Sequence, residues 1–186
     1  MREEHAKIGR ENGMKSEQSL SKDAQAELDR TLSLAAKAGE ANNVAKLLAA
    51  GGNPQEEDLM GCNAFEWAAR SESVETMEIL AERCDINRRN INGWSPLAEA
   101  IIMGRGEETL RFLLSLSDLG MKHKVLGRDV EAGFQEFAKL SNNPMAAEEV
   151  AREELRRAAV AERRQIEEKL QEAGKEAPPT RKPSRI

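Results

Sequence analysis

The middle of the chain repeats itself with a period of about 33 residues. An apolar residue recurs at Leu32, Phe65 and Leu97, and an alanine follows each of them three positions later. Each copy contains two short apolar segments separated by a polar turn, which predicts two antiparallel helices. Because one such pair cannot bury its apolar side alone, the copies must stack on one another. The sequence therefore predicts an all-α fold built as a helical solenoid.

The segments that open and close each copy resemble those of the ankyrin repeat family. GWSPLAEA (93–100) and MGCNAFEWAA (60–69) are similar to the family's opening motif, and AAGGNPQ (49–55) and RCDIN (83–87) to its closing motif. The resemblance covers roughly residues 28–120. It implies an ankyrin-like solenoid of about three repeats, which would bind other proteins through its turn tips and the exposed face of its first helices.

The copies also depart from the family's motif. Its histidine is replaced by Ser33, Glu66 and Ala98, and its threonine survives only as Ser95. We therefore expect weaker hydrogen bonds between connectors and helices, and a solenoid of modest stability. Glu72 stands where the family usually has a glycine between its two helices.

The segments on either side of the repeats have a different composition. GRDVEAGFQEFAKLSNN (127–143) has helical spacing of apolar residues and predicts an amphipathic helix that caps the third repeat or forms a degenerate fourth unit. Asn143 and Pro144 then begin a long, charged helix. The expected organisation is a flexible N-terminal tail (1–25), an ankyrin-repeat domain with a C-terminal cap (26–143), a long charged helix (144–173) and a disordered basic tail (174–186).

The long helix carries charged residues with an i, i+4 spacing and only a thin apolar seam, made mostly of alanine. Such a seam favours a solvated helix over a coiled coil, so we expect a monomer, with a dimer through this helix as the weaker alternative. The expected intrahelical ion pairs are Glu148 with Arg152, Glu153 with Arg157, and Arg164 with Glu168.

Composition and charge disfavour several classes of partner. The net charge of −5 argues against nucleic acid, whose phosphates require a basic face. No stretch approaches the roughly 18 apolar residues of a membrane span, and the first residues lack the apolar core of a secretory signal. The expected location is the cytoplasm, where Cys62 and Cys84 would be reduced thiols.

The residues available for chemistry do not form a known catalytic arrangement. The only histidines are His5 and His123, and neither lies at a motif spacing from Cys62 or Cys84. The sequence contains no phosphate-binding glycine loop and no pair of cysteines or histidines at zinc-ligand spacing. We therefore expect no catalysis, no cofactor and no metal ion.

The candidate binding surface follows from the resemblance to ankyrin repeats. The matching tips and first-helix positions are unusually apolar, and exposed apolar patches with charged rims mark interaction sites. Inward packing is the alternative for Ile102 and Trp94, and Trp67 is expected in the core. The predicted protein-binding residues are Leu59, Met60, Cys62, Arg70, Arg89, Ile91, Trp94, Ile102 and Met103.

These features together favour a non-catalytic protein–protein interaction module of the adaptor or inhibitor type, whose partner the sequence does not name. One alternative is a bacterial effector delivered into a host cell, with the basic C-terminal tail as its secretion signal. A third and weaker hypothesis is an enzyme that uses Cys62 as its nucleophile.

Overall fold

The computed structural model of the chain describes residues 20–125 and 130–176. Most of the predicted N-terminal tail, most of the predicted basic tail with its proposed secretion signal, and His5 lie outside these ranges. The described helices are α1 (Lys22–Lys37), α2 (Ala41–Ala49), α3 (Ala64–Arg70), α4 (Val74–Ala81), α5 (Pro96–Ile102), α6 (Glu107–Leu116), α7 (Phe134–Leu140) and α8 (Pro144–Glu176), and the strands are β1 (Lys122–Lys124) and β2 (Glu131–Gly133).

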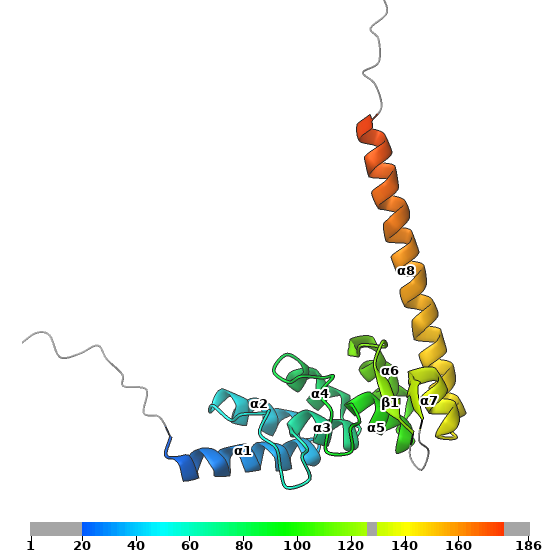
Figure 1. The fold of residues 1–186 in the computed structure, drawn as a ribbon. Coiled ribbons are helices and arrows are strands. Elements are labelled where there is room, and N and C mark those ends of the chain that lie inside the picture. The colour runs from blue at the N-terminus through cyan, green and yellow to red at the C-terminus, as the bar shows by residue number, and fades with distance from the viewer. Residues whose placement is uncertain (1–19, 126–129, 177–186) are drawn as a thin grey trace, which may run out of the picture.

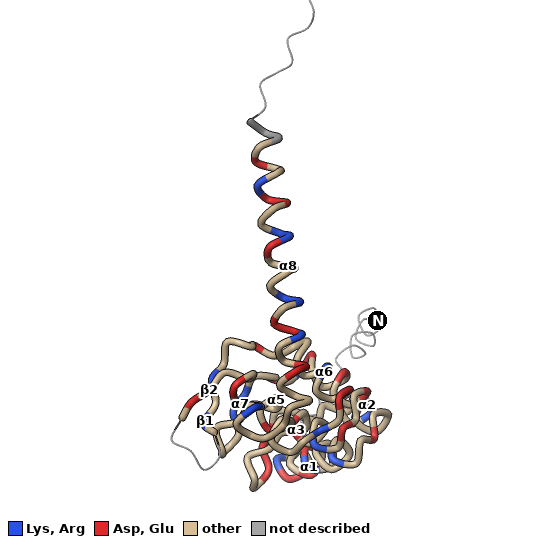
Figure 2. Tube along the Cα trace, turned by 90° about the vertical axis from the view of Figure 1, so that its right-hand side faces the viewer, with Lys and Arg blue, Asp and Glu red and all other residues tan. Residues whose placement is uncertain are grey.

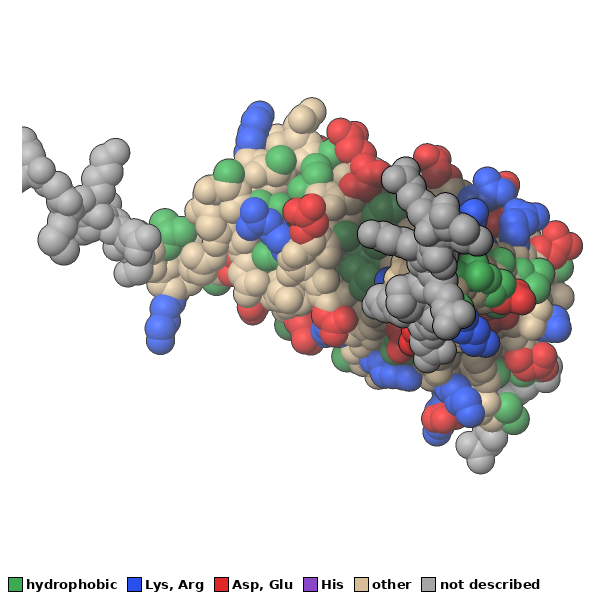
Figure 3. Space-filling view, turned by 90° about the horizontal axis from the view of Figure 1, so that it is seen from above, with side chains coloured by type: hydrophobic (Ala, Val, Ile, Leu, Met, Phe, Trp, Pro, Cys, Tyr) green, Lys and Arg blue, Asp and Glu red, His purple; other side chains and the backbone are tan. Residues whose placement is uncertain are grey.

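The helices form two layers of a solenoid (Figure 1). The first helices of successive units contact one another in the order α1, α3, α5 and α7, and the second helices follow in the order α2, α4, α6 and α8. One continuous core runs between the layers and includes Leu32, Phe65 and Leu97, all fully buried. The predicted all-α solenoid is confirmed. The side of the second helices, seen in Figure 3, carries acidic and basic side chains interspersed with apolar ones.

Each unit turns between its two helices in the same way. The turn contains one residue with a left-handed backbone: Gly39 (φ 71°), Glu72 (φ 59°), Gly104 (φ 63°) and Asn142 (φ 55°). The N–H of the next residue donates to a carbonyl five positions earlier in all four turns. Helices α7 and α8 therefore form a fourth, degenerate unit that covers the end of the third repeat.

The helix predicted over 127–143 is shorter than expected, because α7 begins only at Phe134. The preceding Glu131–Gly133 is extended and pairs with β1 in an antiparallel hairpin, with His123 opposite Ala132. Gly133 is the N-cap of α7, and glycine is a poor residue for a helix interior. Residues 126–129, which link the strands, lie outside the described residues.

Helix α8 has two parts with different surroundings. Its first part packs on α6 and α7, with Ala146, Ala147 and Val150 buried and Arg157 donating to the carbonyls of Leu114 and Ser117. From 158 to 173 every side chain is exposed, and this part projects from the stack with mixed charges along its length (Figure 2). No helix in the ranges described is both long and apolar enough to cross a membrane.

One of the three predicted ion pairs of α8 forms among the described residues. Glu153 binds Arg157 at 2.8 Å, as predicted. The other two predicted pairs do not form within the described residues. Arg152 instead contacts Glu149, which is held from the opposite side by Arg111 of α6, and Arg163 lies 3.6 Å from Glu167. Contacts with α6 thus override the i, i+4 pattern near the start of the helix.

Candidate protein-binding groove

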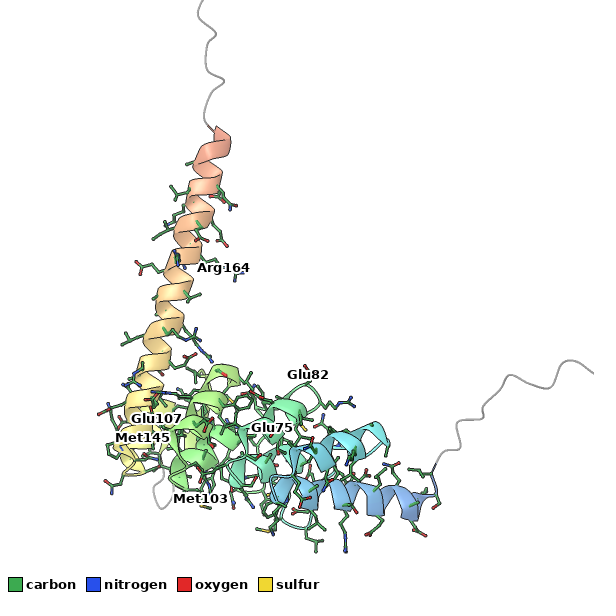
Figure 4. The ribbon with its side chains drawn as sticks, turned by 180° about the vertical axis from the view of Figure 1, so that it is seen from behind. Glu75, Glu82, Met103, Glu107, Met145 and Arg164 are labelled. Carbon is green, nitrogen blue, oxygen red and sulfur yellow. The ribbon has the colours of Figure 1, made fainter. Side chains whose placement is uncertain are left out.

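A groove of about 490 Å³ lies on the side of the first helices and the turn tips. Figure 4 places Met103, one of its residues, on the side of the stack opposite to Glu82, the C-cap of α4. Three consecutive units contribute to it. Its lining residues are Lys37, Met60, Trp67, Arg70, Ser71, Asn92, Trp94, Glu99, Met103 and Arg105. The structure therefore brings together four of the predicted binding residues, namely Met60, Arg70, Trp94 and Met103.

The two tips that border the groove are built by equivalent residues. Asp58 Oδ1 accepts hydrogen bonds from the backbone N–H groups of Met60 (2.8 Å) and Cys62 (3.0 Å). In the next tip, Asn90 Oδ1 accepts from the N–H groups of Asn92 (3.0 Å) and Trp94 (3.2 Å). Each tip is therefore a loop whose backbone is held in one conformation by hydrogen bonds within the chain itself.

Trp67 lines the groove and also packs against the core, so the expected core position describes only part of its surroundings. It is half-buried, and its indole N–H donates to Asp58 Oδ2 at 2.9 Å. Lys37 Nζ and the Arg70 guanidinium carbon lie 4.4 and 4.7 Å from the ring centre, within the range of cation–π attraction. Burial opposes ionisation of Asp58, but the N–H groups of Cys62, Met60 and Trp67 hold its pKa below the usual value.

A buried ion pair fixes the cation beside Trp67. Arg70 binds Glu99 through its Nε (2.9 Å) and Nη2 (2.5 Å), and the Glu99 side chain is only 5% exposed. The amide of Asn90 donates to the other oxygen of Glu99 at 3.3 Å. The Arg70 side chain is thus held in place by the next repeat, although its position was predicted only as an exposed one.

Trp94 contacts both the groove and the core, the two locations between which the sequence did not decide. It lines the groove, but it is half-buried against the core and its indole N–H donates to the Lys124 carbonyl at 3.2 Å. Arg89 also contacts the hairpin, donating to the carbonyls of Gly93 (2.8 Å) and Lys122 (2.7 Å). These hydrogen bonds to Lys122 and Lys124 attach the second tip to the hairpin.

A family model for ankyrin repeats, in three copies, matches residues 32–124, which is half of the chain. The chain belongs to the ankyrin repeat family. A search of curated proteins finds no match to the sequence. Ankyrin repeats are generally protein–protein interaction modules and are typically non-catalytic.

The remaining predicted residues lie at different depths in the ankyrin units. Leu59 and Ile91 are exposed at the two tips but do not line the groove. Ile102 is half-buried and packs on the core, the inward alternative for this residue. Cys62 is fully buried, so the prediction that it lies on the surface is wrong. Its position is equivalent to Trp94 of the next ankyrin tip, where the larger indole reaches the groove.

The two thiols of the ankyrin domain are unsuited to nucleophilic chemistry. Cys62 and Cys84 are free, and burial raises the pKa of each thiol to about 11. Because the thiolate is the reactive form, neither residue is activated at neutral pH. A serine–histidine contact, between Ser95 Oγ and His123 Nε2 (3.3 Å), is buried, and Ser95 caps α5. No group of potential metal ligands occurs in the parts of the chain that the structure describes.

The glycines of the two ankyrin tips provide a matched test of how the tips fit together. Gly61 (φ 69°) and Gly93 (φ 76°) both have left-handed backbones, but a Cβ on Gly61 would lie 2.5 Å from Ile91 Cγ2, whereas one on Gly93 would meet nothing within 4 Å. We expect Gly93→Ala to cost about 1 kcal/mol of unfolding free energy and Gly61→Ala about 2 kcal/mol. Urea unfolding of both variants measures this difference, and equal costs would show that the tips do not contact each other in solution.

Proposed function

We propose that this chain is a non-catalytic adaptor or inhibitor that binds a partner protein in the groove defined above. The observation that carries this proposal is the meeting of Trp67 and Trp94, the only tryptophans of the chain, in one groove with Met60 and Met103. Tryptophan is over-represented among the residues that dominate binding energy. Both methionines are about half exposed, and methionine adapts its shape to an apolar partner surface.

The rigidity of the groove supports a binding role. Its tips are fixed by Asp58 and Asn90, and its central cation is fixed by Glu99. A surface held in place before association loses less conformational entropy when it binds, which increases affinity. A preorganised surface without an activated nucleophile suits a protein that holds or blocks a partner.

Partner capture from the native cell, followed by an affinity measurement with the captured partner, tests this proposal. We expect Trp67→Ala to weaken binding by about 2 kcal/mol, roughly 30-fold in Kd, because its indole fills the middle of the groove. Met103→Ala should weaken it less. Leu155→Ala is the matched control, because this exposed side chain lies on α8, away from the groove.

The stability of each variant decides how a loss of binding is interpreted. Trp67→Ala should leave the far-UV circular dichroism spectrum unchanged. Because Trp67 and Trp94 both pack against the core and donate from their indoles, to Asp58 and Lys124, the melting temperature of each alanine variant is measured beside its affinity. Partner binding that survives both Trp67→Ala and Met103→Ala at wild-type affinity would exclude the groove as the binding surface.

A further inference from the structure

The sign of the charge in the groove points to the chemistry of the partner. We propose that the groove binds an acidic peptide segment that places one apolar side chain against the tryptophans. This inference rests on the proposed binding function and specifies which kind of segment would occupy the groove. Three features of the groove support it: the charges of its lining residues, its exposed apolar side chains and the ion pairs of its cations.

The groove is locally basic although the chain as a whole is acidic. Among its lining residues, the cations Lys37, Arg70 and Arg105 outnumber the carboxylate of Glu99. Two further carboxylates lie next to the lining, Asp58 beside Trp67 and Glu72 beside Arg105. The chain carries a net charge of −5, so the lining residues, taken by themselves, have the opposite sign to the whole chain. A segment with negative charges is attracted to such a face, whereas a basic segment is repelled from it.

The cations differ in how far their charge is already neutralised. Arg70 is paired with Glu99 and holds the wall of the groove. Arg105 lies 3.4 Å from Glu72, and both are partly exposed, so a competing carboxylate can displace this weak pair. Lys37 takes part in none of the ion pairs formed among the described residues. Its ammonium lies over Trp67 and is the cation most available to a carboxylate.

The apolar part of the groove lies between these cations. Trp67 is adjacent to Lys37 and Arg70, and Met60 and Met103 are 52% and 53% exposed. An apolar side chain placed here covers the indoles and the methionines, while carboxylates on either side of it reach Lys37 and Arg105. One apolar residue between acidic residues therefore matches the arrangement of the groove.

Intrinsic fluorescence tests this inference directly, because the chain has no tyrosine and both of its tryptophans line the groove. The probes are three pentapeptides with blocked ends, in which one leucine stands between two pairs of glutamates, glutamines or lysines. We expect the glutamate peptide to change the tryptophan emission saturably, and more weakly as the salt concentration rises. The glutamine peptide should bind at least five-fold more weakly, and the lysine peptide should have no effect.

Two variants assign the effect to the groove cation. Lys37→Gln should weaken binding of the glutamate peptide several-fold and leave binding of the glutamine peptide unchanged. Lys46→Gln, an exposed lysine of α2 that does not line the groove, is the matched control and should change neither. Both lysines are exposed, and circular dichroism checks that the variants remain folded.

The outcomes separate this inference from the proposed function. Equal binding of the glutamate and glutamine peptides, or stronger binding of the lysine peptide, overturns the acidic assignment while binding in the groove stands. No change in emission with any peptide up to millimolar concentration overturns the inference as a whole. The proposed function is decided separately, by whether Trp67→Ala weakens capture of the natural partner.

Discussion

Replacing Arg88 with methionine is expected to lower the free energy of unfolding by about 3 to 5 kcal/mol at neutral pH. Arg88 Nη1 binds Glu66 Oε2 at 2.7 Å, and the Glu66 side chain is only 1% exposed. The same guanidinium donates to the Gly61 carbonyl at 3.0 and 3.1 Å. Methionine preserves most of the side-chain volume but leaves a buried carboxylate without its cation. The other oxygen, Glu66 Oε1, already has no hydrogen-bond partner among the described residues.

The double variant Arg88→Met with Glu66→Gln is the control. Its neutral amide removes the unpaired charge and should recover most of the loss, although not the bonds to Gly61.

Burial already raises the pKa of Glu66 in the wild type, against the opposing effects of the Asn63 N–H and Arg88. Removing Arg88 raises this pKa further, so the penalty should shrink as the pH falls and Glu66 is protonated in the folded state. Urea unfolding at pH 7 and pH 5 measures both effects. A loss below about 1 kcal/mol at pH 7 would contradict this account of the pair.

This pair shows one limit of predicting the fold from the sequence. Glu66 stands where the family has a histidine, and this replacement predicts weak hydrogen bonds between connector and helix. In the structure, Arg88, 22 residues further along the chain, binds Glu66 and connects the two segments. Asn63 adds a capping box, in which its side chain accepts from Glu66 N and Glu66 accepts from Asn63 N. Side chains that reach between units have no periodicity, so the repeat pattern does not reveal them.

The repeats themselves were predictable because burial imposes a regular pattern. Leu32, Phe65 and Leu97 recur at the period of the unit, and all three are fully buried in one core. The hairpin was not predictable in this way, because Val130, Phe134 and Phe137 have helical spacing in the sequence. The pairing of β2 with β1 and the N-cap Gly133 keep the chain extended before α7 begins, and this long-range pairing leaves no periodic signal in the sequence.

The candidate groove was predicted in part, and the missing residue had a signal in the sequence. Trp67 is equivalent in the repeat alignment to Leu34 and Glu99, and Glu99 also lines the groove. Comparing the three units position by position sets Trp67 beside the exposed Leu34 and the charged Glu99, which indicates a position that faces the groove as well as the core. The bond from Trp67 to Asp58 had no such signal, because it depends on how the tip folds back over α3.

Acidification from pH 7.5 to pH 4.5 is expected to cost the wild type about 2 to 3 kcal/mol through His123 alone. Its side chain is fully buried, with Phe134 and Phe137 at ring-centre distances of 4.8 and 5.7 Å. Burial, and then the charge of Arg89, lower its pKa from 6.5 to about 4. The unfolded chain therefore binds a proton near pH 6.5 that the folded chain does not bind until about pH 4. The stability from this residue is complete above pH 6.5 and is lost progressively as the pH falls towards 4.

The hydrogen bonds of His123 explain why the folded state resists its protonation. Arg89 Nη1 lies 3.1 Å from His123 Nδ1, and because a guanidinium can only donate, this nitrogen is the acceptor. Nε2 then carries the proton and faces Ser95 Oγ at 3.3 Å. A proton on Nδ1 would make this nitrogen a donor that faces the Arg89 N–H. It would also place the charged imidazolium beside the charged guanidinium. Two groups oppose this effect, the Gly93 carbonyl at 3.4 Å from Nδ1 and the carboxylate of Glu131 in β2.

His123→Gln separates this effect from the titration of the carboxylates. Glutamine has no proton to gain in this range, so its loss of stability between pH 7.5 and pH 4.5 should be about 2 to 3 kcal/mol smaller than that of the wild type. Urea unfolding of both proteins at the two pH values gives the difference. Equal losses would show that His123 titrates at its ordinary pKa and that the hairpin is open in solution. The expected difference would show that the hairpin stays closed over the third repeat, holding the Trp94 side of the groove in place.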